Sequence, residues 1–325
     1  MSFRFGIIGV GYFGRHYVRV VQEVEGAECV GIFTHADEEV KTLSPQIKRY
    51  ASVDELMSDP SIDCIIIATP VSTHADLAIA ALEHGKHVLL EKPMAGSLAD
   101  AKRIAAAVQA SGRTFMIGHQ YCYNGYIREL KKEIENKTIG EIRNIFAQHL
   151  YAGPVRLDIG CFWETATHEL AIIDYLFPGA EPKLITAQMT DMMRCGRDDA
   201  TTALISFDNG LTTTIVTSWF APQKVRRMLF AGTKGMAVFD EKEEHPLTLT
   251  KYSYPIGESP EIHTSHFFDM NNAERVMPTV DTTEPLRNQV MHFMECIREQ
   301  KIPLTGIDHA LRVTKILDGV TNSSK

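Results

Sequence analysis

The chain has 325 residues, more than one hydrophobic core usually supports, so its length predicts two domains of ordinary size. Hydrophobic residues make up 44% and charged residues 23%, which is typical of folded globular proteins. With 33 basic and 41 acidic residues the net charge is -8, and such a chain exerts no diffuse attraction on nucleic acid or anionic lipid. We therefore expect a small molecule as its partner, with no role for nucleic acid or a membrane.

The cysteines and histidines show no pattern of a metal site or a disulfide framework. Six cysteines are scattered along the chain without a CxxC pair, and the 13 histidines include no HExxH motif. The first residues lack the apolar region and the cleavage site of a signal peptide, and no apolar run approaches the length of a membrane span. The expectation is a cytoplasmic protein that holds no metal.

From residue 3 to residue 119, short apolar runs alternate with helical patterns, which is typical of a parallel sheet with crossover helices. Strands are expected at residues 5–9, 28–33, 64–68, 88–90 and 114–118. Helices are expected between them, at residues 13–25, 74–84 and 97–110. We predict a Rossmann domain with a doubly wound parallel sheet over residues 1–120.

After residue 120 the pattern changes to helices and runs of strands, which favours an α+β domain. Asp208-Asn209-Gly210 predicts a tight hairpin, because Asn-Gly tolerates the positive φ angles of such a turn. Residues 255–285 are expected to be mostly loop, and the last helix can pack back on the first domain. Residues 121–325 should form a domain for substrate binding and oligomerisation with a large, mostly antiparallel sheet. Helices are expected at 126–135, 164–177, 286–300 and 308–320, and strands at 141–151, 203–207, 211–219 and 236–239.

The segment Gly9-Val10-Gly11-Tyr12-Phe13-Gly14 lies between the first predicted strand and the first predicted helix. In this context Gly9 allows a tight turn, Gly11 lets the backbone approach a pyrophosphate, and Gly14 lets the helix pack closely on the strand. The amino end of the helix then offers unpaired N–H groups to the phosphates. The segment predicts a bound dinucleotide, with Tyr12 and Phe13 among its contacts.

The residues that end the second strand bear on the choice between NAD and NADP. An acidic side chain at this position usually holds the adenine ribose, but here the chain reads Phe33-Thr34-His35. Thr34 brings no negative charge against a 2'-phosphate and His35 can contact it, so NADP is modestly favoured over NAD. The alternative is that Asp37 bends back to the ribose and makes NAD the cofactor.

Glu91-Lys92-Pro93 follows the apolar strand at residues 88–90. Strand ends of an open parallel sheet point to the crevice where dinucleotides bind, so Lys92 is expected beside the nicotinamide. Taken alone, the tripeptide favours the alternative, a turn with a surface lysine.

Glu164 and His168 are four residues apart in a predicted helix. With Ala166, Leu170 and Ile173 on the buried side, the pair falls on the opposite side and can face a cleft together. Histidine suits the removal and return of a hydroxyl proton, because its ordinary pKa is close to neutral. The alternative is an ordinary contact between two solvated side chains.

Several motifs, in their order along the chain, resemble the Gfo/Idh/MocA oxidoreductases, a family named for glucose-fructose oxidoreductase and inositol dehydrogenase. The resemblance covers nearly the whole chain. It implies an NAD(P)-dependent oxidoreductase in which Thr69, Pro70, His74 and Glu91 belong to the cofactor cleft. The motifs are the glycine segment at 9–14, Ala68-Thr69-Pro70 with His74, Gly85-Lys86-His87-Val88, Glu91-Lys92-Pro93, and Gly118-His119 with Tyr123-Asn124.

The resemblance also implies that Lys92 contacts the reacting hydroxyl and that the second domain brings an acidic residue and a histidine to the substrate. Here these are Glu164 and His168, whereas the common family form has aspartate in place of this glutamate and glycine in place of Ala166. We expect His168 as the base and Lys92 as its oxygen-binding partner, although the two roles can be exchanged. Glu164 would orient His168 or hold a neighbouring hydroxyl.

Gly153-Pro154-Val155-Arg156 and Trp163 resemble the family branch that acts on nucleotide-linked or amino sugars. The expected reaction moves a hydride between nicotinamide and a carbinol carbon of a sugar, a sugar nucleotide or a related polyol. Substrate contacts are expected, by position, from Tyr123, Asn124, Arg156 and Trp163. The alternatives are a biliverdin-reductase-like reductase of another small molecule and a catalytically silent NAD(P)-binding regulator. The family implies a homodimer or homotetramer.

Overall fold

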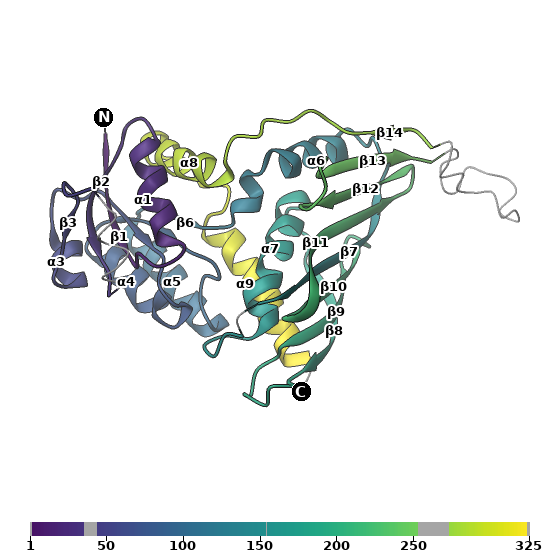
Figure 1. Ribbon diagram of the computed structural model, residues 1–325, viewed down its shortest axis with the longest axis horizontal. Helices are drawn as coiled ribbons and strands as arrows, with labels where there is room; N and C mark the ends of the chain where they lie inside the picture. The colour runs from purple at the N-terminus through teal and green to yellow at the C-terminus, as the bar shows by residue number, and fades with distance from the viewer. Residues whose placement is uncertain (1, 36–43, 154, 253–272, 324–325) are drawn as a thin grey trace, which may run out of the picture. The chain divides into compact units, whose positions relative to one another are not determined.

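The computed structural model describes residues 2–35, 44–153, 155–252 and 273–323. The chain divides into two compact units, coloured along the chain in Figure 1. The first unit contains Met1–Tyr123 and Thr283–Lys315, and the second contains Asn124–Thr282 and Ile316–Lys325. Residues 283–315, which the sequence placed in the second domain, therefore belong to the compact unit that contains the N-terminus.

A six-stranded parallel sheet forms the centre of the first unit, with the strand order β3-β2-β1-β4-β5-β6. The chain runs outward from β1 in one direction and then from β4 in the other, so the strand order reverses between these two neighbours. In open parallel sheets a dinucleotide binds at the carboxyl ends of the strands at such a reversal. The strands are β1 (Phe3–Ile8), β2 (Ala27–Phe33), β3 (Lys48–Arg49), β4 (Cys64–Ile67), β5 (His87–Leu90) and β6 (Phe115–Ile117).

Helices connect these strands where the apolar spacing predicts them. In α1 (Gly14–Glu23) the buried residues include Tyr17, Val20 and Val21, as the apolar spacing predicts. The predicted helices α4 (His74–Glu83) and α5 (Leu98–Ser111) also bury apolar residues. Ser97 caps α5 by accepting a hydrogen bond from the Asp100 N–H at 3.1 Å. The short α3 (Val53–Ser58) and the two-residue β3 were not predicted, because neither is long enough to show a period.

The second unit contains an eight-stranded sheet with the order β14-β13-β12-β11-β7-β10-β9-β8. Its pairs are antiparallel except for β10 with β7, which run parallel. Asp208-Asn209-Gly210 forms the predicted hairpin between β9 and β10, with Gly210 at φ +83°. The strands are β7 (Ile142–Ala152), β8 (Pro182–Thr190), β9 (Ala200–Phe207), β10 (Thr212–Ser218), β11 (Phe220–Gly232), β12 (Gly235–Asp240), β13 (Leu247–Lys251) and β14 (Arg275–Val276).

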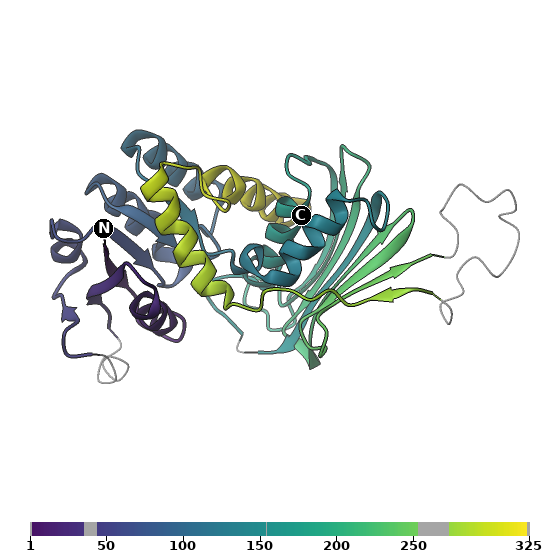
Figure 2. The same cartoon turned by 90° about the horizontal axis from the view of Figure 1, so that it is seen from above.

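The helices α6 (Gly125–Glu135) and α7 (Cys161–Leu176) lie on one face of this sheet, as Figure 2 shows. The buried side of α7 is confirmed, whereas the alternative, that Glu164 and His168 form an ordinary contact on a solvated side, was wrong. Nearly every side chain of α7 is buried, and Glu164 is half-buried. A helix enclosed on all sides loses the polar face on which amphipathic analysis depends.

The segment from residue 283 onward completes the first unit. Within α8 (Pro285–Glu299), Phe293 packs against Phe5 of β1, and Glu284 just before the helix pairs with Arg19 of α1 at 2.6 Å. Thr305 lies along the edge strand β6, where its carbonyl accepts the Ile117 N–H at 2.9 Å. The last helix, α9 (Ile307–Ser323), contributes its residues up to Lys315 to this unit. The predicted architecture, a Rossmann sheet followed by a large, mostly antiparallel sheet, is confirmed.

Candidate active site

The glycine segment turns from β1 into α1 with the geometry that the motif requires. Gly9 has φ +88°, which favours glycine, and a Cβ on Gly14 would overlap the carbonyl oxygen of Gly9. A Cβ on Gly11 would meet nothing within 4 Å, so the backbone is open there to an approaching ligand. The Val10 N–H is held by the Thr34 hydroxyl at 3.3 Å, and Tyr12 projects outward with 76% of its surface exposed. This segment is shaped to receive a pyrophosphate.

Near the end of β2 lies a cation, Arg49, that the sequence did not single out. Thr34 is buried and His35 is exposed, and the guanidinium of Arg49 donates to the Thr34 carbonyl at 3.1 Å. Arg49 reaches this position because β3 pairs with β2, where it lies opposite Ile32. Asp37, the alternative ribose ligand, and Pro154 lie outside the described residues. The described side chains at this strand end therefore offer a hydroxyl, an imidazole and a guanidinium.

Lys92 follows β5 and is anchored through its neighbour Glu91. The Tyr17 hydroxyl donates to one Glu91 oxygen at 2.6 Å, and the Lys92 N–H donates to the other at 3.1 Å. Gln289 of α8 donates to the Tyr17 hydroxyl at 2.9 Å. A Cβ on Gly118 would lie 2.6 Å from a Glu91 oxygen, so glycine leaves the room that this carboxyl group needs. Glu91 is buried and holds the Lys92 backbone.

Burial raises the pKa of Glu91 to about 7, although the bond from Tyr17, the Lys92 charge and the Lys92 N–H all act in the opposite direction. Burial also raises the pKa of Tyr17 well above its ordinary value, and the Glu91 carboxylate adds to this effect. Tyr17 therefore remains a hydrogen-bond donor at neutral pH. The Glu91 carboxyl group changes its charge near neutral pH, directly beside the residue that carries the candidate chemistry.

Thr69, Pro70 and His74 line the neighbouring strand end, after β4. The hydroxyl groups of Thr69 and Thr73 are 2.7 Å apart, and Pro70 is exposed. The predicted cofactor contact from His74 was wrong, because the ring is buried and each of its nitrogens lies 2.9 Å from a backbone carbonyl, one of Thr69 and one of Pro93. His74 thus ties the segment after β4 to the segment after β5.

Two buried histidines lie at the end of β6, and the sequence analysis missed this pair. A ring nitrogen of His119 lies 2.8 Å from a ring nitrogen of His309, so one imidazole donates to the other. Burial holds the pKa of His119 well below its usual range, and His309 and Lys92 act in the same direction. The parallel register of Leu90 with Ile117 brings Lys92 and His119 to corresponding positions beyond their strands. The two histidines are 190 positions apart in the chain, so there is no local sequence signal for the contact.

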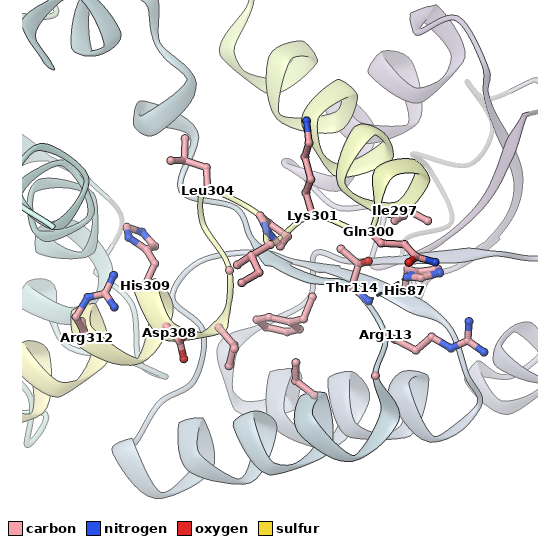
Figure 3. Close-up of a pocket in the computed structure, with 17 residues that line it drawn as sticks. His87, Arg113, Thr114, Ile297, Gln300, Lys301, Leu304, Asp308, His309 and Arg312 are labelled. Atoms are coloured by element: carbon pink, nitrogen blue, oxygen red, sulfur yellow. Dashed lines mark hydrogen bonds between the residues drawn. The ribbon is translucent and has the colours of Figure 1, made fainter. Parts of the chain in front are cut away.

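A cavity of about 880 Å³ runs beside β6 and the chain between α8 and α9. Figure 3 shows His87, Arg113 and Thr114 at one end of it, and Asp308, His309 and Arg312 at the other. His87 and Thr114 lie at the amino ends of β5 and β6, away from the strand ends that carry Lys92. None of the predicted site residues lines this cavity, which is therefore distinct from the candidate cofactor crevice.

In the second unit, Glu164 belongs to a chain of hydrogen bonds. The Tyr151 hydroxyl of β7 donates to a Glu164 oxygen at 3.0 Å, and the Trp219 indole donates to the Tyr151 oxygen at 3.0 Å. Burial raises the pKa of Tyr151 above its ordinary value, and the neighbouring Glu164 adds to this effect. One carboxylate oxygen of Glu164 is thus fixed by a neutral tyrosine, and glutamate has the length that this contact requires.

His168 lies one turn after Glu164 on α7 and is 9% exposed. Its ring stacks on that of His149 from β7, with centroids 5.9 Å apart and planes 21° apart. His149 in turn lies 3.0 Å from a Glu169 oxygen. Neither His149 nor Glu169 was singled out from the sequence, because both are scattered polar residues until the fold places α7 on β7.

The four predicted substrate contacts have structural partners. Tyr123 is fully buried and its hydroxyl lies 3.0 Å from that of Thr305, so the prediction that it contacts substrate was wrong. Asn124 caps α6 by accepting the Tyr126 N–H at 2.9 Å. Arg156 pairs with Asp158 at 2.6 Å. Trp163 is buried, and its indole donates to Thr321 at 2.9 Å.

Other kinds of site are not found in the described part of the chain. Its histidines, cysteines and carboxylates form no cluster of three that could hold a metal ion. No described helix is both long and apolar enough to cross a bilayer. Burial raises the pKa of the Cys161 thiol to about 12, so this cysteine, just ahead of Glu164, is an inert packing residue.

Comparison with known proteins identifies the family. Residues 3–119 match the model of the Gfo/Idh/MocA oxidoreductase family with an NAD-binding Rossmann fold, and residues 127–238 match a C-terminal domain of the same family. The chain is 26% identical to scyllo-inositol 2-dehydrogenase (NAD(+)) of Bacillus subtilis over 95% of its own length and 91% of the relative's. It is 31% identical to inositol 2-dehydrogenase of Salmonella paratyphi B over 54% and 55% of the two chains.

Solved structures agree on the fold. The UDP-N-acetylglucosamine 3-dehydrogenase of Acidithiobacillus ferrooxidans superposes with a TM-score of 0.82, covering 99% of this chain and 98% of the other at 22% identity. The predictions of a two-domain fold and of a nicotinamide-dependent dehydrogenase are confirmed by these matches. The chain therefore belongs to the Gfo/Idh/MocA family of NAD-binding oxidoreductases.

Proposed function

We propose that this protein oxidises a CH–OH group of a sugar, a sugar nucleotide or a related polyol to a carbonyl group, or reduces that carbonyl group in the reverse direction. The observation that carries the proposal is the anchoring of Lys92 by a buried carboxyl group at the carboxyl end of β5. The nicotinamide supplies the acceptor for the hydride that leaves the carbinol carbon. The names of the inositol dehydrogenases above support a polyhydroxylated substrate.

The proton must leave the hydroxyl group as the hydride leaves carbon. His168 is the base that takes it, because an imidazole can accept and return a proton near neutral pH. Lys92 donates a hydrogen bond to the same oxygen and stabilises its developing negative charge. Glu164, held at one oxygen by Tyr151, uses its other oxygen to orient His168 or a neighbouring substrate hydroxyl. The roles of His168 and Lys92 can be exchanged.

A panel assay tests this function. The full chain is incubated with NAD or NADP and with myo-inositol, scyllo-inositol, aldoses and UDP-linked sugars, and reduced nicotinamide is followed by absorbance. Turnover with a member of the panel supports the proposal. Turnover only in the reductive direction on carbonyl or imine compounds supports the biliverdin-reductase-like alternative, and tight cofactor binding without any turnover supports the silent regulator.

We also propose that NADP is preferred to NAD. The guanidinium of Arg49 beside Thr34 supports this, because it can contact a 2'-phosphate where the usual ribose-binding carboxylate is replaced. An Arg49→Ala variant should raise the KM for NADP about tenfold and change the KM for NAD less than about twofold. Arg113→Ala, at the other end of the same sheet, is the control. Equal effects of Arg49→Ala on both cofactors would rule out a phosphate contact.

Assembly as a homodimer or homotetramer is supported by the second face of the large sheet. A row of side chains crosses this face from Leu204 through Thr214 and Phe146 to Leu229. Phe146 is 49% exposed and Leu204 is 46% exposed, which is costly in water unless another surface covers them. Phe146→Asp is expected to convert the oligomer to monomer in light scattering, with Thr214→Ser as control. A wild-type monomer at micromolar concentration would contradict the proposal.

All six cysteines are free thiols, and five of them are buried. This supports the expected reducing, cytoplasmic compartment, because disulfides are typical of secreted proteins.

A further inference from the structure

Beneath His168 lies a group of polar side chains that the proposed reaction does not use. His149 is in the middle of it, on β7 between β10 and β11. One of its ring nitrogens, Nδ1, lies 3.0 Å from a Glu169 carboxylate oxygen, and both side chains are buried. The other, Nε2, accepts a hydrogen bond from Nε of Arg226 at 3.1 Å. The Arg226 guanidinium also donates a hydrogen bond to a Glu241 carboxylate oxygen at 3.1 Å.

These contacts determine where the His149 proton is. Arginine has only donors, so the Nε2 atom that faces Arg226 must present a lone pair. The single proton of the ring is then on Nδ1, where it donates to the Glu169 carboxylate. A second proton on Nε2 would face the Arg226 N–H and break that bond. His149 is therefore held as the Nδ1–H tautomer.

We propose that His149 is a positioning residue, an imidazole on which His168 stacks, and that Arg226 holds it in the Nδ1–H tautomer. This inference rests on the proposed role of His168 as the proton acceptor. The two rings are 5.9 Å apart and within 21° of parallel, so His149 limits the tilt of the His168 ring. Of the two stacked imidazoles, only His168 takes the proton from the substrate hydroxyl, and the O–H bond breaks as that N–H bond forms.

The other charged and titratable groups around His149 come from each neighbouring element. Helix α7 contributes Glu169, His168 itself and, through Tyr151, Glu164. On its own strand the Tyr151 ring lies 5.8 Å away. Strand β11 contributes Arg226, and β10 places the uncharged Thr217 opposite His149. Arg226 donates to Nε2 of the ring, so its removal is the change that should let the ring proton move between the two nitrogens.

The test is imidazole 15N NMR on the full chain, with the His149 signals assigned by their loss in His149→Asn. In the wild type, His149 should show the Nδ1–H tautomer. In Arg226→Leu, which removes the donor to Nε2, it should show a mixture of the two tautomers. Arg226→Gln places an amide N–H at the position of the Arg226 Nε, and should restore the Nδ1–H tautomer. An Nε2–H tautomer in the wild type would overturn the proposal without any variant.

Kinetics on the best substrate of the panel test the effect on His168. In Arg226→Leu kcat should fall about threefold to tenfold with KM within about twofold, because His168 then stacks on a ring whose tautomer is no longer fixed. Arg227→Leu is the matched control, because Arg227 is next on the strand, 51% exposed and 4.0 Å from Asp240. An unchanged kcat in a variant whose His149 tautomer has changed would refute the link to His168. Normal NMR behaviour with no turnover on any substrate would instead refute the proposed function.

Discussion

A Lys92→Met variant is expected to fold and to bind NAD(P) while its kcat falls by about 10²–10⁴-fold. The physical reason is that methionine keeps most of the length of the side chain and removes the ammonium group, which stabilises the oxygen as the proton leaves. The Lys92 N–H bond to Glu91 is made by the backbone, so the substitution leaves that anchor in place. Steady-state kinetics with saturating cofactor and a fluorescence titration of NADPH check the two halves of the prediction.

Lys102→Met provides the control for this variant. Lys102 is an exposed residue of α5 in the same unit, so its loss removes the same charge away from the strand ends. It should leave kcat within about twofold of the wild type. If Lys92→Met kept near-normal turnover, Lys92 would have no chemical role, and its position after β5 would be that of an ordinary turn residue.

A Glu91→Gln variant is expected to change how stability depends on pH. In the unfolded chain the ordinary pKa of glutamate is about 4.5, whereas burial raises the pKa of Glu91 in the folded protein to about 7. Between these values the folded state binds more protons than the unfolded state, so the free energy of unfolding falls as pH rises. The loss is on the order of 3 kcal/mol across this range. Glutamine has no such proton, and this fall should be absent from the variant.

Urea unfolding of both proteins at several pH values from about 4.5 to 8 measures the difference. The other titratable groups are shared, so subtracting the two curves isolates Glu91. Tyr17→Phe is the matched comparison, because the bond from the Tyr17 hydroxyl lowers the pKa of Glu91. Its removal should extend the fall in stability to higher pH. Parallel curves for wild type and Glu91→Gln would show that Glu91 is ionised in the folded protein throughout this range.

The Glu91 anchor also links the two termini of the first unit. Tyr17 comes from α1, Gln289 from α8, and the two are 272 residues apart in the chain. The same unit holds Phe293 against Phe5 and Thr305 along β6. The segment 283–315 is therefore part of the scaffold that positions Lys92, and its truncation would remove a partner of the Glu91 network.

Local patterns in the sequence were sufficient for the Rossmann unit and for Lys92. The spacing of Gly9, Gly11 and Gly14, the alternation of apolar runs with helical periods, and a lysine directly after a strand are all signals within a few residues. Steric and hydrogen-bonding rules act over that same range, so the strands, the turn at Gly9 and the position of Lys92 at a strand end followed from the sequence. The hairpin at Asn209-Gly210 followed for the same reason.

The partners of the site residues were decided only by the tertiary structure. Arg49 reaches Thr34, Tyr17 and Gln289 enclose Glu91, His309 meets His119, and Arg226 fixes His149 because separate strands and helices pack together. The enclosure of α7 on all sides likewise depends on the sheet beneath it. The sequence named Lys92, Glu164 and His168, but polar side chains have no period from which their partners could be predicted. The contacts that orient these residues come from residues that are distant in the chain.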